Sequence, residues 1–347
     1  MSDFSLHCPL PLDDRTTVQM AHGGGGRAMQ RLIEGLFLPA FGGGAAPPHD
    51  SAVLEANGLR LAFTTDTFVV SPLFFPGGDI GKLAVCGTVN DLAVAGARPA
   101  WLSAGFVLEE GLSMETLRRI VASMRRAADE VGVRIVTGDT KVVDRGKGDG
   151  IFINTAGIGL VRRGVEISPA RVVPGDAVVV SGDLGRHGIA ILSVREGLEF
   201  EGALESDCAP LAGVVEALLA AGCEIHCLRD LTRGGLAAAL NEIAGHARVG
   251  IELEESAIPV AGPVASACEL LGLDPLYVAN EGRLVAFVPA AQADRVVQTM
   301  RSQPVAAGAA VVGTVIAAHP GVVELRNPLG GSRIVDLLSG EQMPRIC

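Results

Sequence analysis

Hydrophobic and polar positions along the chain first follow a run of strands interrupted by two helices. Residues 1–58 are rich in glycine and proline and leave room only for short elements, such as a helix near Arg27–Leu36. The pattern then predicts a buried helix over Ile80–Gly96 and an amphipathic helix that starts after the cap residue Ser113 and ends near Val131. The strands predicted in this part of the chain are Leu59–Thr65, Trp101–Leu108, Arg134–Thr137 and Ile151–Val161.

A second series of elements begins near Pro174-Gly175-Asp176. Its predicted helices are Gly188–Glu196, Pro210–Ala221 and Gly234–Ala247, and its predicted strands are Ala177–Ser181, Val249–Leu253, Leu284–Val288 and Ala310–Ile316. At 347 residues the chain exceeds the roughly 250 to 300 residues over which a single core grows. We therefore expect a mixed α/β fold of two domains, 59–165 and 166–338, with a glycine-rich arm over 1–58 and a flexible tail over 339–347.

Charge and composition exclude several classes of partner. The formal net charge is -11 and no dense Lys/Arg run occurs, so neither nucleic acid nor a membrane surface is an expected partner. No secretory signal and no apolar run of membrane-spanning length are recognisable. The seven cysteines are odd in number and scattered, which suits free thiols in a reducing compartment, and we expect a cytoplasmic protein.

Four aspartates lie where predicted buried elements meet turns of small residues: Asp50, Asp66, Asp91 and Asp139. Converging carboxylates are the ligands that Mg²⁺ prefers when it also binds substrate phosphates. Asp91 and its neighbour Asn90 interrupt a helix that is otherwise apolar, where unpaired polar groups would cost a few kcal/mol. Each acid, Asp50 above all, can also be interpreted as a turn or capping residue.

Other candidate groups follow from local context. Lys141, two residues after Asp139, could offer its ammonium group to a phosphate or an oxyanion, although a solvated surface lysine is the plainer interpretation. Glu281 lies in a glycine turn before a strand and is a candidate for proton transfer. The Gly-Lys pair at Gly81-Lys82 is followed by Leu83 instead of Ser or Thr, so any ATP site is not a P-loop.

The last residue of the sequence is a cysteine on a polar segment without periodicity. An exposed thiol is unusual unless it has a chemical role, although a terminal cysteine can also arise by chance. A thiol at the end of an arm suits a covalent carrier of a reactive group, so Cys347 is the candidate nucleophile.

Several stretches in order along the chain carry a family resemblance. They are Thr64-Thr-Asp-Thr-Phe, the run from Gly81 to Ala97, Thr137-Gly-Asp-Thr-Lys-Val-Val, Arg229-Asp-Leu-Thr-Arg-Gly-Gly-Leu-Ala, Ala279-Asn-Glu-Gly and the terminal Pro-Arg-Ile-Cys. The inner motifs resemble the aminoimidazole ribonucleotide synthetase (PurM-like) superfamily, and the terminal motif resembles the HypE family of hydrogenase maturation proteins.

The resemblance implies a two-domain PurM-like fold and a homodimer joined through the N-terminal domains. It implies ATP and Mg²⁺ at the domain boundary, with Asp50, Asp66, Asp91 and Asp139 as metal or phosphate contacts and Asn90 and Lys141 nearby. The implied reaction is ATP-dependent dehydration of a carbamoyl group on Cys347 to a thiocyanate, with Glu281 as candidate base. This reaction supplies cyanide for the iron of a [NiFe]-hydrogenase.

Implied partners are a HypF-like carbamoyltransferase, which loads Cys347, and a HypC–HypD-like iron-carrying complex, which receives the cyanide. Two alternatives stay open at this point. A selenophosphate synthetase or another kinase on the same scaffold would use ATP without Cys347, and Cys8 is the residue that could replace it. A scaffold protein would bind ATP without consuming it.

Overall fold

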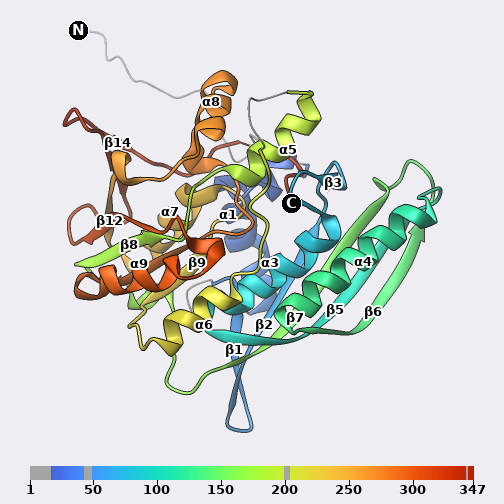
Figure 1. Ribbon diagram of the computed structural model, residues 1–347, viewed down its shortest axis with the longest axis horizontal. Helices are drawn as coiled ribbons and strands as arrows, with labels where there is room; N and C mark the ends of the chain where they lie inside the picture. The colour runs from blue at the N-terminus through green and yellow to red at the C-terminus, as the bar shows by residue number, and fades with distance from the viewer. Residues whose placement is uncertain (1–16, 43–48, 199–203, 341–342) are drawn as a thin grey trace.

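The computed structural model describes residues 17–42, 49–198, 204–340 and 343–347, which form two α/β domains packed side by side (Figure 1). The first domain contains one large sheet and two long helices. Its strands are β1 (Ala52–Ala56), β2 (Leu59–Phe68), β3 (Phe74–Phe75), β4 (Gly78–Asp79), β5 (Ala97–Glu109), β6 (Arg134–Val143) and β7 (Ile151–Val161), and its helices are α3 (Ile80–Val94) and α4 (Met114–Val131).

The five strands of the first sheet lie in the order β1-β2-β7-β5-β6. All pairs are antiparallel except the parallel pair of β5 and β6, which the helix α4 connects. Helices α3 and α4 cover one face of this sheet (Figure 1). The other face is open in the single chain and carries half-exposed Phe63, Trp101, Val107 and Ile158.

The second domain is built on a seven-stranded sheet of order β14-β13-β10-β12-β8-β11-β9. Its strands are β8 (Asp176–Val180), β9 (Cys227–Asp230), β10 (Gly250–Glu254), β11 (Leu284–Pro289), β12 (Ala310–Ile316), β13 (Val323–Arg326) and β14 (Ser332–Ile334). Its helices are α5 (Arg186–Glu196), α6 (Ala212–Ala220), α7 (Gly235–Ala247), α8 (Gly262–Leu271) and α9 (Ala293–Arg301). The mixed α/β fold expected from the sequence is confirmed.

Helix α3 is the element that joins the two domains. It contacts β2, β5, β7 and α4 of its own domain and also α6 and β9 of the second domain. Thirteen of its residues are buried, so it lacks the polar face of an ordinary surface helix. The side chain of Asp79 caps its first turn by accepting from the N–H groups of Gly81 and Lys82.

The N-terminal part differs from a simple arm. A helical stretch follows the glycine run, as predicted, and consists of α1 (Arg27–Leu32), a π-helical turn (Ile33–Phe37) and α2 (Leu38–Phe41). Strand β1, however, pairs along its whole length with β2 and belongs to the first sheet. Within the described part of the chain, no helix combines the length and apolarity needed to cross a membrane.

The C-terminal residues are packed more closely than the sequence predicts. The side chains of Met343 and Ile346 are buried in the same cluster as Ile189 and Ile191, and Cys347 is half-buried against it. The expectation of an exposed thiol is therefore wrong for this structure, because two apolar side chains flanking Pro344 and Arg345 supply enough hydrophobic surface to hold the segment down.

A bulge in β12 shows where the second sheet admits no side chain. The register between β12 and β8 shifts between Val311 and Gly313, and a Cβ at Gly313 would lie 2.2 Å from the backbone oxygen of Glu252. We expect Gly313→Ala to lower the free energy of unfolding by about 1 to 3 kcal/mol, as overpacking does. Chemical denaturation measures this change.

Gly245→Ala is the matched control. Gly245 lies in α7 and is exposed, and a Cβ added there would meet no atom within 4 Å. Alanine should stabilise this helix by about 0.5 to 1 kcal/mol. Equal stability of the two variants would contradict the interpretation of the bulge.

Candidate active site at the domain boundary

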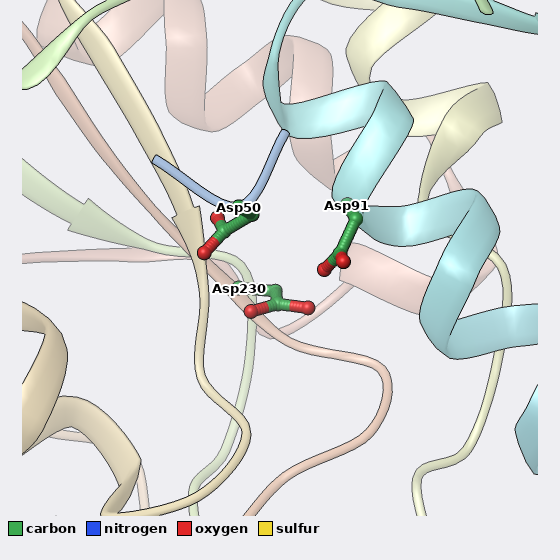
Figure 2. A group of neighbouring side chains, drawn as sticks. All are labelled: Asp50, Asp91 and Asp230. Carbon is green, nitrogen blue, oxygen red and sulfur yellow. The ribbon is translucent and has the colours of Figure 1, made fainter. Parts of the chain in front are cut away.

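Three carboxylates from distant parts of the chain meet between the domains (Figure 2). Asp50 lies in the segment before β1, Asp91 in α3, and Asp230 at the end of β9. One oxygen from each lies within 4.8 Å of the others, a spacing at which a single cation could bind all three. The Oδ2 atom of Asp50 and the Nε2 atom of His49 are buried and have no hydrogen-bond partner among the described residues.

Burial changes the electrostatics of this cluster. It raises the pKa of Asp91 well above its usual range, and repulsion by Asp230 and Asp50 raises it further. Burial likewise raises the pKa of Asp230, with repulsion by Asp50 as the next cause. Three acids packed this closely are mutually unfavourable, and a divalent cation with phosphate oxygens would relieve that repulsion. The donor set therefore fits Mg²⁺.

Two arginines balance part of the negative charge. Nε of Arg229 lies 2.7 Å from Oδ1 of Asp50, and Nη2 of Arg229 pairs with Glu242. Burial lowers the pKa of Arg229, but attraction to Asp50 and Glu242 outweighs this and raises it overall. Nη2 of Arg233 lies 4.0 Å from Oδ1 of Asp66.

Asp66 joins the cavity that the three acids line, and Asn90 does not. Asp66 projects from β2 into this cavity, and burial raises its pKa. The amide of Asn90 points instead to the second domain, where it donates to the backbone oxygens of Ala209 (3.1 Å) and Glu281 (3.3 Å) and accepts from the N–H of Leu211 (2.7 Å). Asn90 thus fixes α3 to the second domain.

Asp139 and Lys141 do not reach this cavity within the single chain. Asp66, Thr155, Ala104 and Gly138 form one row across the sheet, so these four positions share a face. Asp139 follows Gly138 directly and points to the opposite, open face, because neighbouring residues of a strand alternate. There it pairs with the ammonium group of Lys141 at 2.7 Å. Of the four acids expected to converge, only Asp50, Asp66 and Asp91 line the cavity. Asp230, which was not expected, lines it as well.

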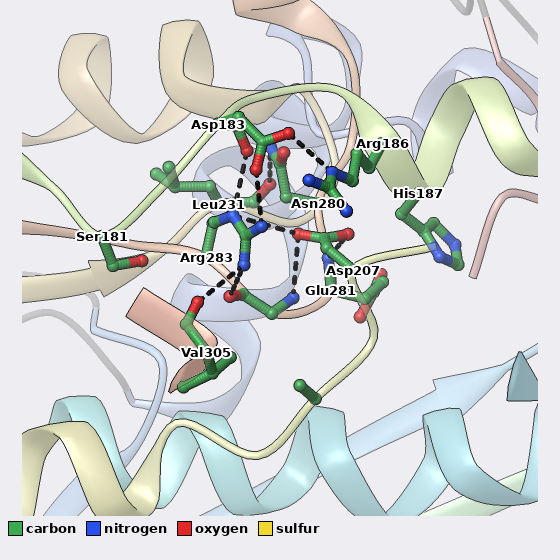
Figure 3. A network of polar contacts seen from close by, with 12 residues as sticks. Ser181, Asp183, Arg186, His187, Asp207, Leu231, Asn280, Glu281, Arg283 and Val305 are labelled. Carbon is green, nitrogen blue, oxygen red and sulfur yellow. Dashed lines mark hydrogen bonds and ion pairs between the residues drawn. The ribbon is translucent and has the colours of Figure 1, made fainter. Parts of the chain in front are cut away.

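Glu281 lies in a loop that is part of a network of polar contacts (Figure 3). Its backbone N–H donates to Oδ1 of Asp207 (3.2 Å), and Arg283 binds Asp183 and lies 3.8 Å from Asp207. The Glu281 carboxyl is fully buried, and its Oε1 atom has no hydrogen-bond partner in the described chain. Burial raises its pKa well above the usual range, with repulsion by Asp230 as the next cause. A buried carboxyl whose pKa is raised in this way is a candidate for proton transfer.

Arg233 connects the acidic cavity with the C-terminal cysteine. It lines the cavity of the acids and also a smaller cavity formed with Gly24, Ala279, Ile346 and Cys347. The negative charge of Cys347 is the largest cause that raises the pKa of Arg233, ahead of the acids Asp66, Glu281 and Asp91. Cys347 therefore lies beside the site, with the guanidinium group of Arg233 between it and the acids.

Sequence reasoning missed several residues of this site, namely His49, Arg229, Asp230 and Arg233. A signal was present for Asp230, because it ends a short strand four residues before the Gly234-Gly235 pair. Carboxylates at strand ends next to glycine turns are frequent ligand positions. The two arginines of the same segment are four residues apart, one directly before Asp230 and the other directly before the glycine pair.

Two family models match the chain. Residues 48–161 match the N-terminal domain, and residues 173–326 the C-terminal domain, of AIR synthase related protein. These ranges coincide with the two observed domains, so the PurM-like expectation is confirmed.

The similar proteins agree on one family. Carbamoyl dehydratase HypE of Rhodobacter capsulatus is 55% identical over 342 residues, which cover 96% of this chain and 99% of the relative. A HypE–HypF complex contains a chain with a TM-score of 0.84 and 47% identity that covers 88% of this chain and 99% of its own. HypE in complex with ATP has a TM-score of 0.81 and 49% identity and covers 95% and 100%.

These relatives favour neither a selenophosphate synthetase nor a small-molecule kinase, and Cys8, on which the former depended, lies outside the described residues. Asp66, Asp91 and Asp230 of the acidic cavity, Glu281 and the terminal cysteine all lie in the motifs that carry the resemblance, and Asp50 lies outside them. The chain belongs to the HypE family of carbamoyl dehydratases, on a scaffold of two AIR synthase-related domains.

Proposed function

We propose that this protein uses ATP to dehydrate a carbamoyl group on the thiol of Cys347, which leaves a thiocyanate whose cyanide goes to the iron of a [NiFe]-hydrogenase. The observation that carries the proposal is the position of Cys347. It lies in a cavity with Arg233, whose guanidinium also lines the acidic cavity next to Glu281. A carrier thiol, a buried carboxyl and a cation site are thus within one region.

Asp50, Asp91 and Asp230 are the residues that would hold Mg²⁺, and Asp66 borders the same cavity. The unpartnered Oδ2 of Asp50 supports this assignment, because a buried carboxylate oxygen without a partner is costly. When bound, the cation would offset the charge of the ATP phosphates. Arg233 is positioned to bind phosphate oxygens between the acids and Cys347.

The chemistry follows from what an S-carbamoyl group needs in order to lose water. Its oxygen is a poor leaving group until it accepts the γ-phosphoryl group of ATP, which gives ADP. The C–O bond then breaks with release of phosphate, and the nitrogen loses both of its protons as the C≡N bond forms. Glu281 is the proposed base, because burial raises the pKa of its carboxyl and so makes the carboxylate a stronger base, and its Oε1 atom has no hydrogen-bond partner among the described residues.

A homodimer is the proposed assembly, formed through the open face of the first sheet. Half-exposed Phe63, Trp101, Val107 and Ile158 on three adjacent strands form an apolar surface of the kind that interfaces cover. Asp139 and Lys141 lie on the same face. We propose that their predicted role in phosphate or metal binding is exerted toward the second copy.

Two further proteins are proposed as partners. The solved HypE–HypF complex is of a relative, and a HypF-like carbamoyltransferase is the proposed donor of the carbamoyl group to Cys347. A HypC–HypD-like iron-carrying complex is the proposed acceptor of the cyanide. Thiolate is a suitable leaving group for that last transfer.

Removing the carrier thiol tests the central step. Cys347→Ala should abolish both the mass gain of carbamoyl loading and the later loss of one water, while ATP affinity stays within about twofold, because the thiol is not among the proposed nucleotide contacts. Mass spectrometry of the C-terminal peptide reads both steps. Cys223→Ala, at a buried thiol remote from the site, is the matched control and should load normally. A dehydrated adduct in Cys347→Ala would refute the carrier role.

The cation site is tested without turnover. Mg²⁺ with ATP should raise the melting temperature of the wild-type protein, because a ligand of the folded state stabilises it in proportion to its binding. Asp230→Asn should weaken Mg-ATP binding at least about tenfold and lose most of this shift, since one charged ligand is gone. Asp129→Asn changes an exposed acid on α4 and should retain the full shift. Equal shifts in both variants would remove Asp230 from the site.

Glu281 is tested by separating binding from chemistry. Glu281→Gln should bind ATP and accept the carbamoyl group normally but dehydrate about 10² to 10⁴ times more slowly, as expected for a lost general base. Single-turnover measurements on loaded protein give the rate. Dehydration at the wild-type rate would show that another group accepts the proton.

A further inference from the structure

Residues 343–347, called the C-terminal segment below, lie along helix α5 of the second domain. The backbone N–H of Val69 donates to a backbone oxygen of Cys347 (2.9 Å), and that of Ser71 donates to the oxygen of Arg345 (3.3 Å). This pairing places the C-terminal segment between the chain that follows β2 and helix α5. The segment is thus held from two sides by different domains.

Arg195 of α5 binds two successive carbonyl groups of this segment. Its Nη1 donates to the oxygen of Pro344 (2.5 Å) and its Nη2 to that of Arg345, while its Nε donates to the oxygen of Ser71 (2.7 Å). The planar guanidinium fork therefore joins the C-terminal segment to the chain after β2 through one side chain. These contacts involve only backbone acceptors.

His187, near the start of the same helix, binds the next carbonyl group. Its Nε2 lies 2.7 Å from the oxygen of Ile346, and its Nδ1 lies 2.8 Å from Oγ of Ser206. Oγ of Ser206 also accepts from the N–H of Cys208 (3.0 Å), so its hydroxyl is free to donate to Nδ1. This pattern assigns the proton to Nε2 of a neutral ring, and burial lowers the pKa of His187 in agreement.

The same face of α5 receives the apolar side chains. Met343 and Ile346 are buried in the cluster that contains Ile189 and Ile191. A Cβ at Gly188 would lie 2.5 Å from Cγ1 of Val278 and 3.2 Å from the sulfur of Met343, so this position of the helix admits only glycine. Within residues 187–195, two polar side chains thus bind the carbonyl groups of residues 344–346, and Gly188 leaves room for the side chain of Met343.

We propose that α5 is a latch, in which His187 and Arg195 hold the C-terminal segment in its docked position by binding three successive backbone carbonyls. Both are positioning residues. The docked position places Cys347 beside Arg233, but a half-buried cysteine whose backbone is tied to Val69 cannot enter the active site of another protein. The latch therefore sets the balance between a docked segment, competent for dehydration, and a released segment, competent for loading. The consequence for loading and dehydration rests on the function proposed above, whereas the docking itself does not.

The first test measures docking without any assumed activity. The native protein is treated with iodoacetamide, and alkylation of Cys347 is followed by mass spectrometry, with buried Cys86 and Cys268 as internal references. Arg195→Ala and His187→Ala should each increase the rate at Cys347 at least about fivefold, the usual effect of losing one hydrogen bond to a backbone acceptor. Arg195→Lys, which keeps the charge but loses the fork, should lie between Arg195→Ala and wild type.

The matched control is Val194→Ala on the same helix. Val194 is 43% exposed and makes no contact with the C-terminal segment among the described hydrogen bonds or core clusters, so its alkylation rate should equal that of wild type. If circular dichroism shows that His187→Ala does not fold, the test uses Arg195→Ala alone. The side chain of Arg195 is only partly buried, so its removal should leave the fold intact. Unchanged alkylation of Cys347 in Arg195→Ala would overturn the latch.

The second test compares carbamoyl loading, which requires a released segment, with dehydration, which requires a docked segment. In both variants, carbamoyl loading by the carbamoyltransferase should proceed at or above the wild-type rate. Single-turnover dehydration of the loaded protein should fall in step with the docked fraction, with unchanged ATP affinity. General damage to the fold would slow both steps and would count against the proposal. The two proposals can fail separately. If alkylation of Cys347 is faster in the variants but the wild-type protein never dehydrates a carbamoyl group, the latch is supported and the proposed function is refuted.

Discussion

The structure depends on burying helix α3 from two sides at once. One side packs on the first sheet and the other on α6 and β9 of the second domain, so almost no position of the helix is available for solvated polar groups. Two adjacent polar residues nevertheless occupy its last turns. Asn90 directs its amide to backbone groups of the second domain, and Asp91 turns to the neighbouring cavity. The same burial that joins the domains therefore also creates the acidic site.

The charge distribution of the site follows from this arrangement. The pKa values of Asp91, Asp230 and Glu281 are raised first by burial and then by repulsion from neighbouring carboxylates, and the arginines at 229 and 233 offset only part of that repulsion. A protein tolerates such a cluster when a ligand supplies the missing positive charge. A cation with phosphate, as proposed above, would relieve this repulsion.

Different parts of the site are held with different rigidity. Glu281 is fixed by Asp207 and the Arg283–Asp183 pair, all from one buried network of the second domain (Figure 3). Cys347, in contrast, reaches the site on a segment held by a few backbone carbonyl contacts and two buried side chains. The proposed base is thus held by a buried polar network and the proposed carrier by a segment with few contacts, an arrangement that suits the proposed loading at one protein and conversion at another.

The sequence by itself determined the two α/β domains, the apolar α3 with its polar Asn90-Asp91 pair, and the candidacy of Glu281 and Cys347. These features are local, because periodicity and the position of a polar residue in an apolar run survive without knowledge of the fold. Only the tertiary structure decided which acids meet. It brings Asp230 to Asp50 and Asp91 across long stretches of chain, and within the single chain it keeps Asp139 out of this cavity because one residue of strand register sends that side chain to the opposite face. It also decided that the terminal segment is docked, since the partners of Met343, Ile346 and their carbonyl groups belong to a helix about 150 residues earlier in the chain.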